Sequence, residues 1–186
     1  MAFEVPKSFY YIAGGVSIAL AIFLGRIAGA HRENPEALRQ GVAITLIDSS
    51  WSERSSKPGK VALVPTLTFK IRNTREAPLE YVQVNAVFSF VGSKDSFGDA
   101  FAYPIQGKQL KTGEQTDAIR VKSNHGYQAT SRKSFVNNPD FKPAEVSVFV
   151  QSRLSGWVLV GKFPISSKID GMPQQLILPL KARLSS

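Results

Sequence analysis

The chain has 186 residues, with 23 lysines and arginines against 14 aspartates and glutamates, and its formal net charge at pH 7 is +9. It contains no cysteine, which excludes disulfide bonds and thiolate metal sites. The length allows one sizeable domain after the N-terminal segments, and the charge favours anionic partners, either lipid head groups or acidic protein surfaces.

Residues 1–7 form an N-terminal tail, and the sequence predicts a transmembrane anchor helix over residues 8–30. Residues 8–25 are eighteen positions without Asp, Glu, Lys, Arg or His. As a helix they would cover roughly 27 Å, which is close to the hydrocarbon thickness of a bilayer. The alternative is a cleaved secretory signal with Lys7 as its basic start and Ala28–Ala30 as its cleavage site, although the apolar run is longer than the roughly 7–15 residues of such signals.

Small residues recur at every fourth position of this segment and predict a ridge that packs against other membrane helices, because helices in lipid associate through close backbone approach. The helix-packing residues are Ala13, Ser17, Ala21, Gly25 and Gly29. The alternative is that the ridge only reflects the frequent use of Gly and Ala in membrane helices.

The side of the membrane that the rest of the chain occupies is open. Lys7 precedes the span and Arg26, Arg32 and Arg39 follow it, a count that favours a cytoplasmic C-terminal region. The very short N-terminal tail and the extracytoplasmic character of the following β-module favour the opposite. We expect an inner (cytoplasmic) membrane protein with a periplasmic domain.

Residues 31–41 are interpreted as a juxtamembrane linker. Within them Asn34 is a candidate N-cap and Pro35 a candidate first helical residue, so the sequence predicts a turn of helix there.

From Val42 to the C-terminus, residues 42–186, apolar residues alternate with polar ones, which is typical of strands with one buried face. The predicted strands are 42–46, 61–71, 82–90, 100–105, 116–122, 146–150, 157–165 and 176–184. Seven or eight short strands without a long amphipathic helix predict an antiparallel β-sandwich of the immunoglobulin or fibronectin type.

Asn73 and Pro78 are read as structural residues. Asn73 ends a strand by bonding nearby backbone, and Pro78 directs the chain into the next strand.

The segments 66–74, 77–84 and 110–115 resemble FxLYD-type domains, which are similar to late-embryogenesis-abundant and fibronectin type III sandwiches. The shared pattern is a strand ending in Asn73, a small loop, Pro78-Leu79, a further strand and a later turn around Thr112-Gly113. The resemblance implies a membrane-tethered β-sandwich and transfers no functional site, and the Phe-x-Leu-Tyr-Asp string itself is absent from this chain.

No catalytic or metal-binding constellation is evident. The two histidines, His31 and His125, are far apart in the sequence and have no second His or Cys at metal-ligand spacing, and the carboxylates are scattered singly. We therefore expect no catalytic residue, no metal, no cofactor and no enzymatic activity.

A polar segment from Ser123 to Lys142 reads as one long loop, and loops of about this length are frequently functional. Three aromatic residues in it and four neighbouring basic residues are candidate partner-docking side chains: Tyr127, Phe135, Phe141, Arg120, Lys122, Arg132 and Lys133. Phe135 is a candidate because few apolar neighbours surround it in the sequence. Most other aromatics, including Trp51, Trp157, Phe88, Phe90, Phe101 and Tyr103, are expected in the core.

Together these features favour a non-catalytic accessory subunit, anchored by one helix, whose basic β-sandwich braces a larger integral-membrane complex such as a respiratory or photosynthetic assembly. The expected partners are polytopic membrane-protein subunits, with anionic lipid head groups possible and nucleic acid not expected. The alternative is a membrane-tethered module that binds lipid or another hydrophobic ligand, which a gap between the sheets would favour.

Overall fold

The computed structural model describes residues 34–55, 60–131, 133–136, 138, 141–153 and 155–171. The anchor 8–30, its helix-packing residues and the closing strand 176–184 lie outside this part of the chain. No helix among the described residues is long and apolar enough to span a membrane.

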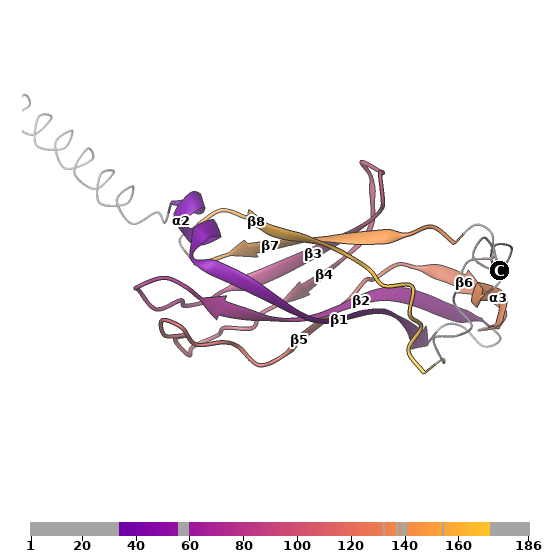
Figure 1. Cartoon of the computed structure of the whole chain (residues 1–186), viewed down its shortest axis with the longest axis horizontal. Helices are drawn as coiled ribbons and strands as arrows, with labels where there is room; N and C mark the ends of the chain where they lie inside the picture. The colour runs from indigo at the N-terminus through magenta and orange to yellow at the C-terminus, as the bar shows by residue number, and fades with distance from the viewer. Residues whose placement is uncertain are drawn as a thin grey trace, which may run out of the picture.

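The described chain is mostly β-structure in two antiparallel sheets that face each other (Figure 1). Its elements are α2 (Pro35–Gln40), β1 (Val42–Ser55), β2 (Val61–Asn73), β3 (Gln83–Phe90), β4 (Ser96–Ala102), β5 (Ile119–Lys122), β6 (Tyr127–Ala129), α3 (Lys133–Val136), β7 (Ala144–Gln151) and β8 (Val158–Pro164). Sheet one has the order β1-β2-β5, with β6 also paired to β2, and sheet two has the order β4-β3-β7-β8. This arrangement confirms a sandwich-like all-β architecture.

The core lies between the sheets, because the alternating apolar positions of each strand point inward. Along β2 these include Leu63, Leu67, Phe69 and Ile71, all fully buried. Strands β3 and β7 oppose them with a second inward row, of which Val84, Phe88, Val146 and Val148 are fully buried. The period-two pattern thus predicted the buried faces of β2, β3 and β7 correctly.

Strands β5 and β6 are two halves of one edge strand, broken opposite Pro65. In an antiparallel strand the N–H and C=O of a residue point to the same neighbour. The Ser123 amide donates to the Pro65 carbonyl (3.0 Å), but proline has no N–H to return a bond. The edge strand leaves the ladder after Lys122 and rejoins it at Tyr127.

The residues of this break join the two sheets at one edge of the sandwich. The side chain of Asn124 donates to the Asp99 carboxylate (2.6 Å), and its Oδ1 accepts from the Asp99 amide (3.0 Å). The Asn124 amide also donates to the Asp99 carbonyl at 3.2 Å. Because Asp99 lies in β4 of sheet two, these hydrogen bonds link the broken edge strand of sheet one to the neighbouring edge of sheet two.

Helix α2 is packed onto the domain, and the predictions for its start are confirmed. The Asn34 side chain caps it by accepting from the Glu36 amide, Pro35 is at its beginning, and Leu38 is fully buried in the core. Gly41 ends the helix, and β1 begins at the next residue. The part of the expected linker from Asn34 onward is therefore held against the sandwich.

Asn73 has the structural role that the sequence predicts. Its side chain is fully buried at the end of β2 and donates to the carbonyls of Ala77 (3.0 Å) and Leu110 (2.9 Å). Its Oδ1 accepts from the Arg75 amide at 2.9 Å.

The interpretation of 123–142 as a single loop is wrong. Strand β6 and the short helix α3 lie within it, because Tyr127 and Ala129 continue the inward-facing pattern of the broken edge strand.

Candidate docking surfaces

The outer face of sheet one carries a row of cations, which we call the basic face: Lys70, Arg72, Arg120 and Lys122. On β2, Lys70 and Arg72 alternate with the buried Phe69 and Ile71 and so point outward. On the adjacent β5, Arg120 and Lys122 alternate with the buried Ile119 and Val121. The register brings the two pairs onto one surface, since Arg120 lies opposite Thr68 and Lys122 opposite Thr66.

Arg120 also holds the chain that follows β8 against the edge of sheet one that β1 forms. Its guanidinium lies 2.8 Å from the Asp170 carboxylate and 2.9 Å from Ser52 Oγ. Ser52 donates to the same carboxylate (2.6 Å) and accepts from Thr66 (2.9 Å). Partial burial alone would raise the pKa of Asp170, but hydrogen bonds from Ser52 and Ser50 and the charge of Arg120 hold it below its ordinary value of 3.8.

Of the other basic candidates, only Lys122 has a side chain in the described part of the structure. Lys122 is exposed, and no hydrogen bond or ion pair of its side chain occurs among the described residues. Lys133 begins α3, and Arg132 lies outside the described part of the chain. The structure therefore groups Arg120 and Lys122 with Lys70 and Arg72, which the sequence analysis did not single out.

The three aromatic docking candidates lie at the opposite end of the sandwich from α2 and pack against the domain. The Trp51 ring is 5.5 Å from that of Tyr127 and 4.9 Å from that of Phe141, centroid to centroid. Tyr127 and Phe141 are half-buried, and Phe135 is 3% exposed. The premise that Phe135 lacks apolar neighbours is wrong, because the short helix α3 turns its ring into the core.

The outer face of sheet two carries large apolar side chains instead. Phe101, Asn85, Phe149 and Leu159 lie directly opposite one another on β4, β3, β7 and β8, so one row crosses the whole sheet. Trp157 precedes β8 and extends over this row, with its ring centroid 6.1 Å from that of Phe101.

We call Phe101, Tyr103, Trp157 and Leu159 the aromatic patch. Phe101 and Tyr103 are each 53% exposed, Trp157 is 42% exposed and Leu159 is 37% exposed. The expectation that Phe101, Tyr103 and Trp157 belong to the core is wrong, whereas Trp51 and Phe88 are buried as expected. The alternation in residues 100–103 allows either the two alanines or the two aromatics to face the core. In the structure the alanines face the interior and the aromatics face outward.

The surroundings of the aromatic patch are mostly polar, and they include Asp99, which lies two residues before Phe101 on the same outer face of β4. Gln83 and Gln151 lie opposite each other on the same outer face, between β3 and β7. The Asn85 side-chain oxygen is buried and has no hydrogen-bond partner among the described residues. At the same end of the sheet, the Arg153 guanidinium lies 5.2 Å from the centre of the exposed Tyr81 ring.

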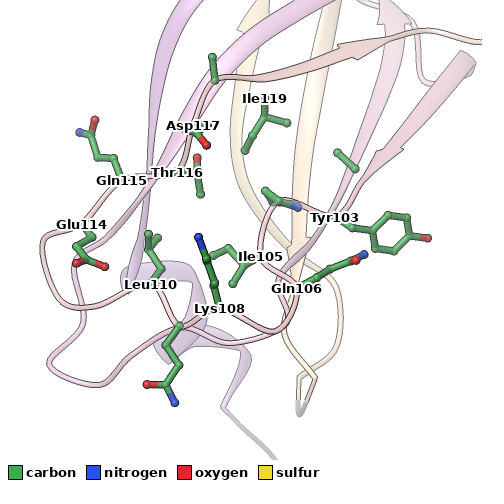
Figure 2. A pocket seen from close by; sticks show the side chains of 14 residues that line it. Tyr103, Ile105, Gln106, Lys108, Leu110, Glu114, Gln115, Thr116, Asp117 and Ile119 are labelled. Carbon is green, nitrogen blue, oxygen red and sulfur yellow. The ribbon is translucent and has the colours of Figure 1, made fainter.

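A cleft of about 520 Å³ opens between the edges of the two sheets, along the connection from β4 to β5 (Figure 2). Its apolar wall includes Ile105, Leu110 and Ile119, which belong to the core. Lys108 and Asp117 line it as well, and Figure 2 shows their charged ends directed toward its middle. We call this the edge cleft.

His125 belongs to the break between β5 and β6. Its Nδ1 lies 2.8 Å from Asn124 Oδ1, within the group that joins Asn124 to Asp99. Among the described residues, no three His, Asp or Glu side chains are grouped closely enough to hold a metal ion.

Comparisons with known proteins assign no family. No family model and no curated protein matches the chain. A similar solved structure is Northeast Structural Genomics Consortium target SoR45, which is 12% identical with a TM-score of 0.40 and is matched over 74% of this chain and 94% of its own.

Two further solved structures are similar over 70% of this chain. The putative ApaA protein from Bordetella pertussis is 12% identical over 95% of its own length, with a TM-score of 0.33. The ligand binding region of serine-glutamate repeat protein A of Enterococcus faecium is 11% identical over 98% of its length, with a TM-score of 0.29. Likenesses at this level assign no function, and the resemblance to FxLYD-type modules stays a prediction.

Proposed function

We propose that this protein is a non-catalytic accessory subunit, anchored in the membrane by residues 8–30, whose β-sandwich braces a larger integral-membrane complex. The observation that carries the proposal is the basic face of sheet one. It gathers Lys70, Arg72, Arg120 and Lys122 on two adjacent strands, and it suits an acidic surface on a partner subunit.

Charge at such a surface acts mainly on association and orientation. Arg72 and Lys122 are exposed, and no hydrogen bond or ion pair of their side chains occurs among the described residues, so both are available to carboxylates of a partner. Complementary charges of this kind steer encounter and fix the orientation of two proteins, and their effect weakens as salt rises.

The short join between anchor and domain supports a bracing role. The predicted anchor ends at residue 30, and the packed helix α2 is capped by Asn34. Because Leu38 of this helix is fully buried in the core, no long flexible linker separates the sandwich from the anchor. A domain held in this way presents its outer faces at a restricted height above the membrane.

In this proposal the anchor lies in the inner membrane and the sandwich on its periplasmic side. Its partners are polytopic subunits, for example of a respiratory or photosynthetic complex, which pack against the small-residue ridge of the anchor and contact the basic face.

The test is purification of the full chain from native membranes in mild detergent, with quantification of co-purifying subunits by mass spectrometry. We expect polytopic subunits in stoichiometric amounts with the wild-type chain. The double variant Arg72→Glu/Lys122→Glu should reduce their recovery about tenfold, because like charges then face each other at the interface.

The matched control is Lys60→Glu/Lys94→Glu, which makes the same change in net charge at exposed positions away from the basic face. This control should retain the partner subunits. Absence of polytopic subunits from the wild-type preparation, or equal losses in the two double variants, would refute the proposal.

The alternative, a tethered module that binds lipid or another hydrophobic ligand, has its own support in the edge cleft. Its volume of about 520 Å³ falls within the usual range of small-molecule sites, and Ile105, Leu110 and Ile119 give it an apolar wall. Lipid that co-purifies with the isolated chain, and is lost when Ala118→Trp fills the cleft, would favour this function.

A further inference from the structure

We infer that the aromatic patch rests in the head-group layer of the bilayer that holds the anchor, so that sheet two lies with one end of its outer face on the membrane. The inference depends on the proposed anchoring by residues 8–30. It adds a second contact surface, distinct from the basic face, and its occupant is lipid.

The aromatic patch lies at the end of the sandwich that is joined to the predicted anchor. Trp157 immediately precedes β8, and α2 packs against β8, so the patch and α2 lie at the same end of the domain (Figure 1). Phe101 and Tyr103 reach this end as well, because β4 runs toward it antiparallel to β3 and pairs Ala102 with Val84.

The segment between the predicted anchor and the domain is short. Asn34 is four residue steps from position 30, the end of the predicted anchor. A fully extended chain of that length spans at most about 14 Å. The α2 end of the sandwich is therefore confined to the vicinity of the membrane surface, whichever leaflet the domain occupies.

The side chains of the aromatic patch are of the types that suit a membrane interface. Trp and Tyr concentrate at membrane interfaces because an apolar ring and a polar N–H or O–H suit the boundary between acyl chains and head groups. Leu159 adds aliphatic surface, and Arg153, stacked on Tyr81, offers its guanidinium to phosphate.

The polar residues around the patch fit the same environment. The outer-face neighbours Gln83, Asn85 and Gln151 are uncharged, and the Asp99 carboxylate on the same face lies farther from the α2 end than Phe101 and accepts a hydrogen bond from the Asn124 side chain. Four exposed apolar side chains on one end of a sheet are unusual for a surface that faces water alone.

The two tryptophans of the chain provide a direct test, since Trp51 is 1% exposed and Trp157 is 42% exposed. The full chain is reconstituted into vesicles of phosphatidylcholine and phosphatidylglycerol, with and without lipids brominated near the head group, which quench tryptophan on contact. The matched variant is Trp157→Phe, which retains an aromatic ring and leaves only Trp51 to fluoresce.

The emission that the wild type has in excess of Trp157→Phe comes from Trp157, and we expect brominated lipid to quench it. The emission of Trp157→Phe, which comes from Trp51, should be the same in both kinds of vesicle. Flotation of the vesicles after alkaline washing is measured on the same samples. Flotation with equal emission in both kinds of vesicle would overturn the inference and leave the anchoring intact, whereas failure to float would refute the anchoring and the inference together.

A protein partner on the patch is a separate outcome. If Trp157→Ser loses the co-purifying subunits from native membranes while wild-type Trp157 is not quenched in vesicles, the patch docks onto protein, and the inference of lipid contact is wrong. The same variant is expected to keep the subunits if the inference is right, because the basic face is unchanged.

Discussion

At the scale of single residues, Asp170 shows how a carboxylate stabilises an irregular segment. The chain after β8 crosses to the outer edge of β1, where the Trp51 amide donates to the Lys168 carbonyl and the Asp170 amide donates to the Trp51 carbonyl. The Asp170 side chain then joins Ser52 of β1 to Arg120 of β5. One carboxylate thus connects this segment to two strands of sheet one.

We predict that Asp170→Asn lowers the free energy of unfolding by about 1 kcal/mol at pH 7, since a partly exposed charged hydrogen-bond acceptor is lost. Because the folded pKa lies below the unfolded value, the carboxylate stabilises fully above pH 3.8, and its contribution is lost as the pH falls through the folded pKa. Denaturant unfolding followed by tryptophan fluorescence should therefore show the two proteins converging in acid.

Asp48→Asn is the control for this experiment. Asp48 pairs with Lys168 at 3.6 Å, but both side chains are well exposed. Its removal should cost less than that of Asp170 at neutral pH. Equal effects of the two substitutions, or a constant effect of Asp170→Asn down to acid pH, would contradict the role given to Asp170.

At the scale of elements, the break between β5 and β6 shows how the residue type at one position of a strand alters the pairing along an edge of the sandwich. Pro65 interrupts the ladder, and the residues that leave it pass close to the backbone of β2. An added Cβ at Gly126 would lie 2.0 Å from the Leu63 carbonyl oxygen. Only glycine allows the edge strand to return to β2 here.

We predict that Gly126→Ala lowers the free energy of unfolding by about 2–3 kcal/mol, because backbone atoms of β2 or β6 must move apart. Chemical denaturation measures this loss. The control is Gly156→Ala, where an added Cβ meets no atom within 4 Å, and it should be nearly neutral. A neutral Gly126→Ala would show that the break between β5 and β6 adapts without cost.

The elements themselves were largely predictable, because period-two alternation reports one buried face. The predicted strands at 61–71, 82–90, 146–150 and 157–165 match β2, β3, β7 and β8 to within a few residues. Strand β6 escaped prediction since it has only three residues, Tyr127–Ala129, and its pairing with β2 depends on the distant Leu63. Helix α3 has only four residues and offers no periodic signal.

At the scale of the whole molecule, the sandwich presents two chemically different outer faces. Sheet one displays the basic face and sheet two the aromatic patch, and the core between them separates the two. In the proposed anchored arrangement, the domain would contact lipid through sheet two and an acidic protein through sheet one.

We predict that protease treatment distinguishes the two orientations of the anchored molecule. In sealed inverted vesicles of the inner membrane, a periplasmic sandwich is enclosed and should survive protease, and it should be digested once detergent opens the vesicles. Spheroplasts should show the reverse protection. Digestion in intact inverted vesicles would place the domain in the cytoplasm, as the count of Lys7 against Arg26, Arg32 and Arg39 favours.

The amino-acid sequence by itself determined strands β2, β3, β7 and β8, the inward rows of β2, β3 and β7, the cap of α2 and the role of Asn73, because these depend on neighbours only a few residues away. The tertiary structure alone decided which aromatics are exposed and which cations share a face. Phe101 and Tyr103 alternate with Ala100 and Ala102, and either row could have been buried. Phe135 became a core residue only because distant strands surround it, and pairing of β2 with β5 placed Lys70 and Arg72 on the same outer face as Arg120 and Lys122. Burial and surface charge depend on contacts between residues far apart in the chain, which local periodicity does not report.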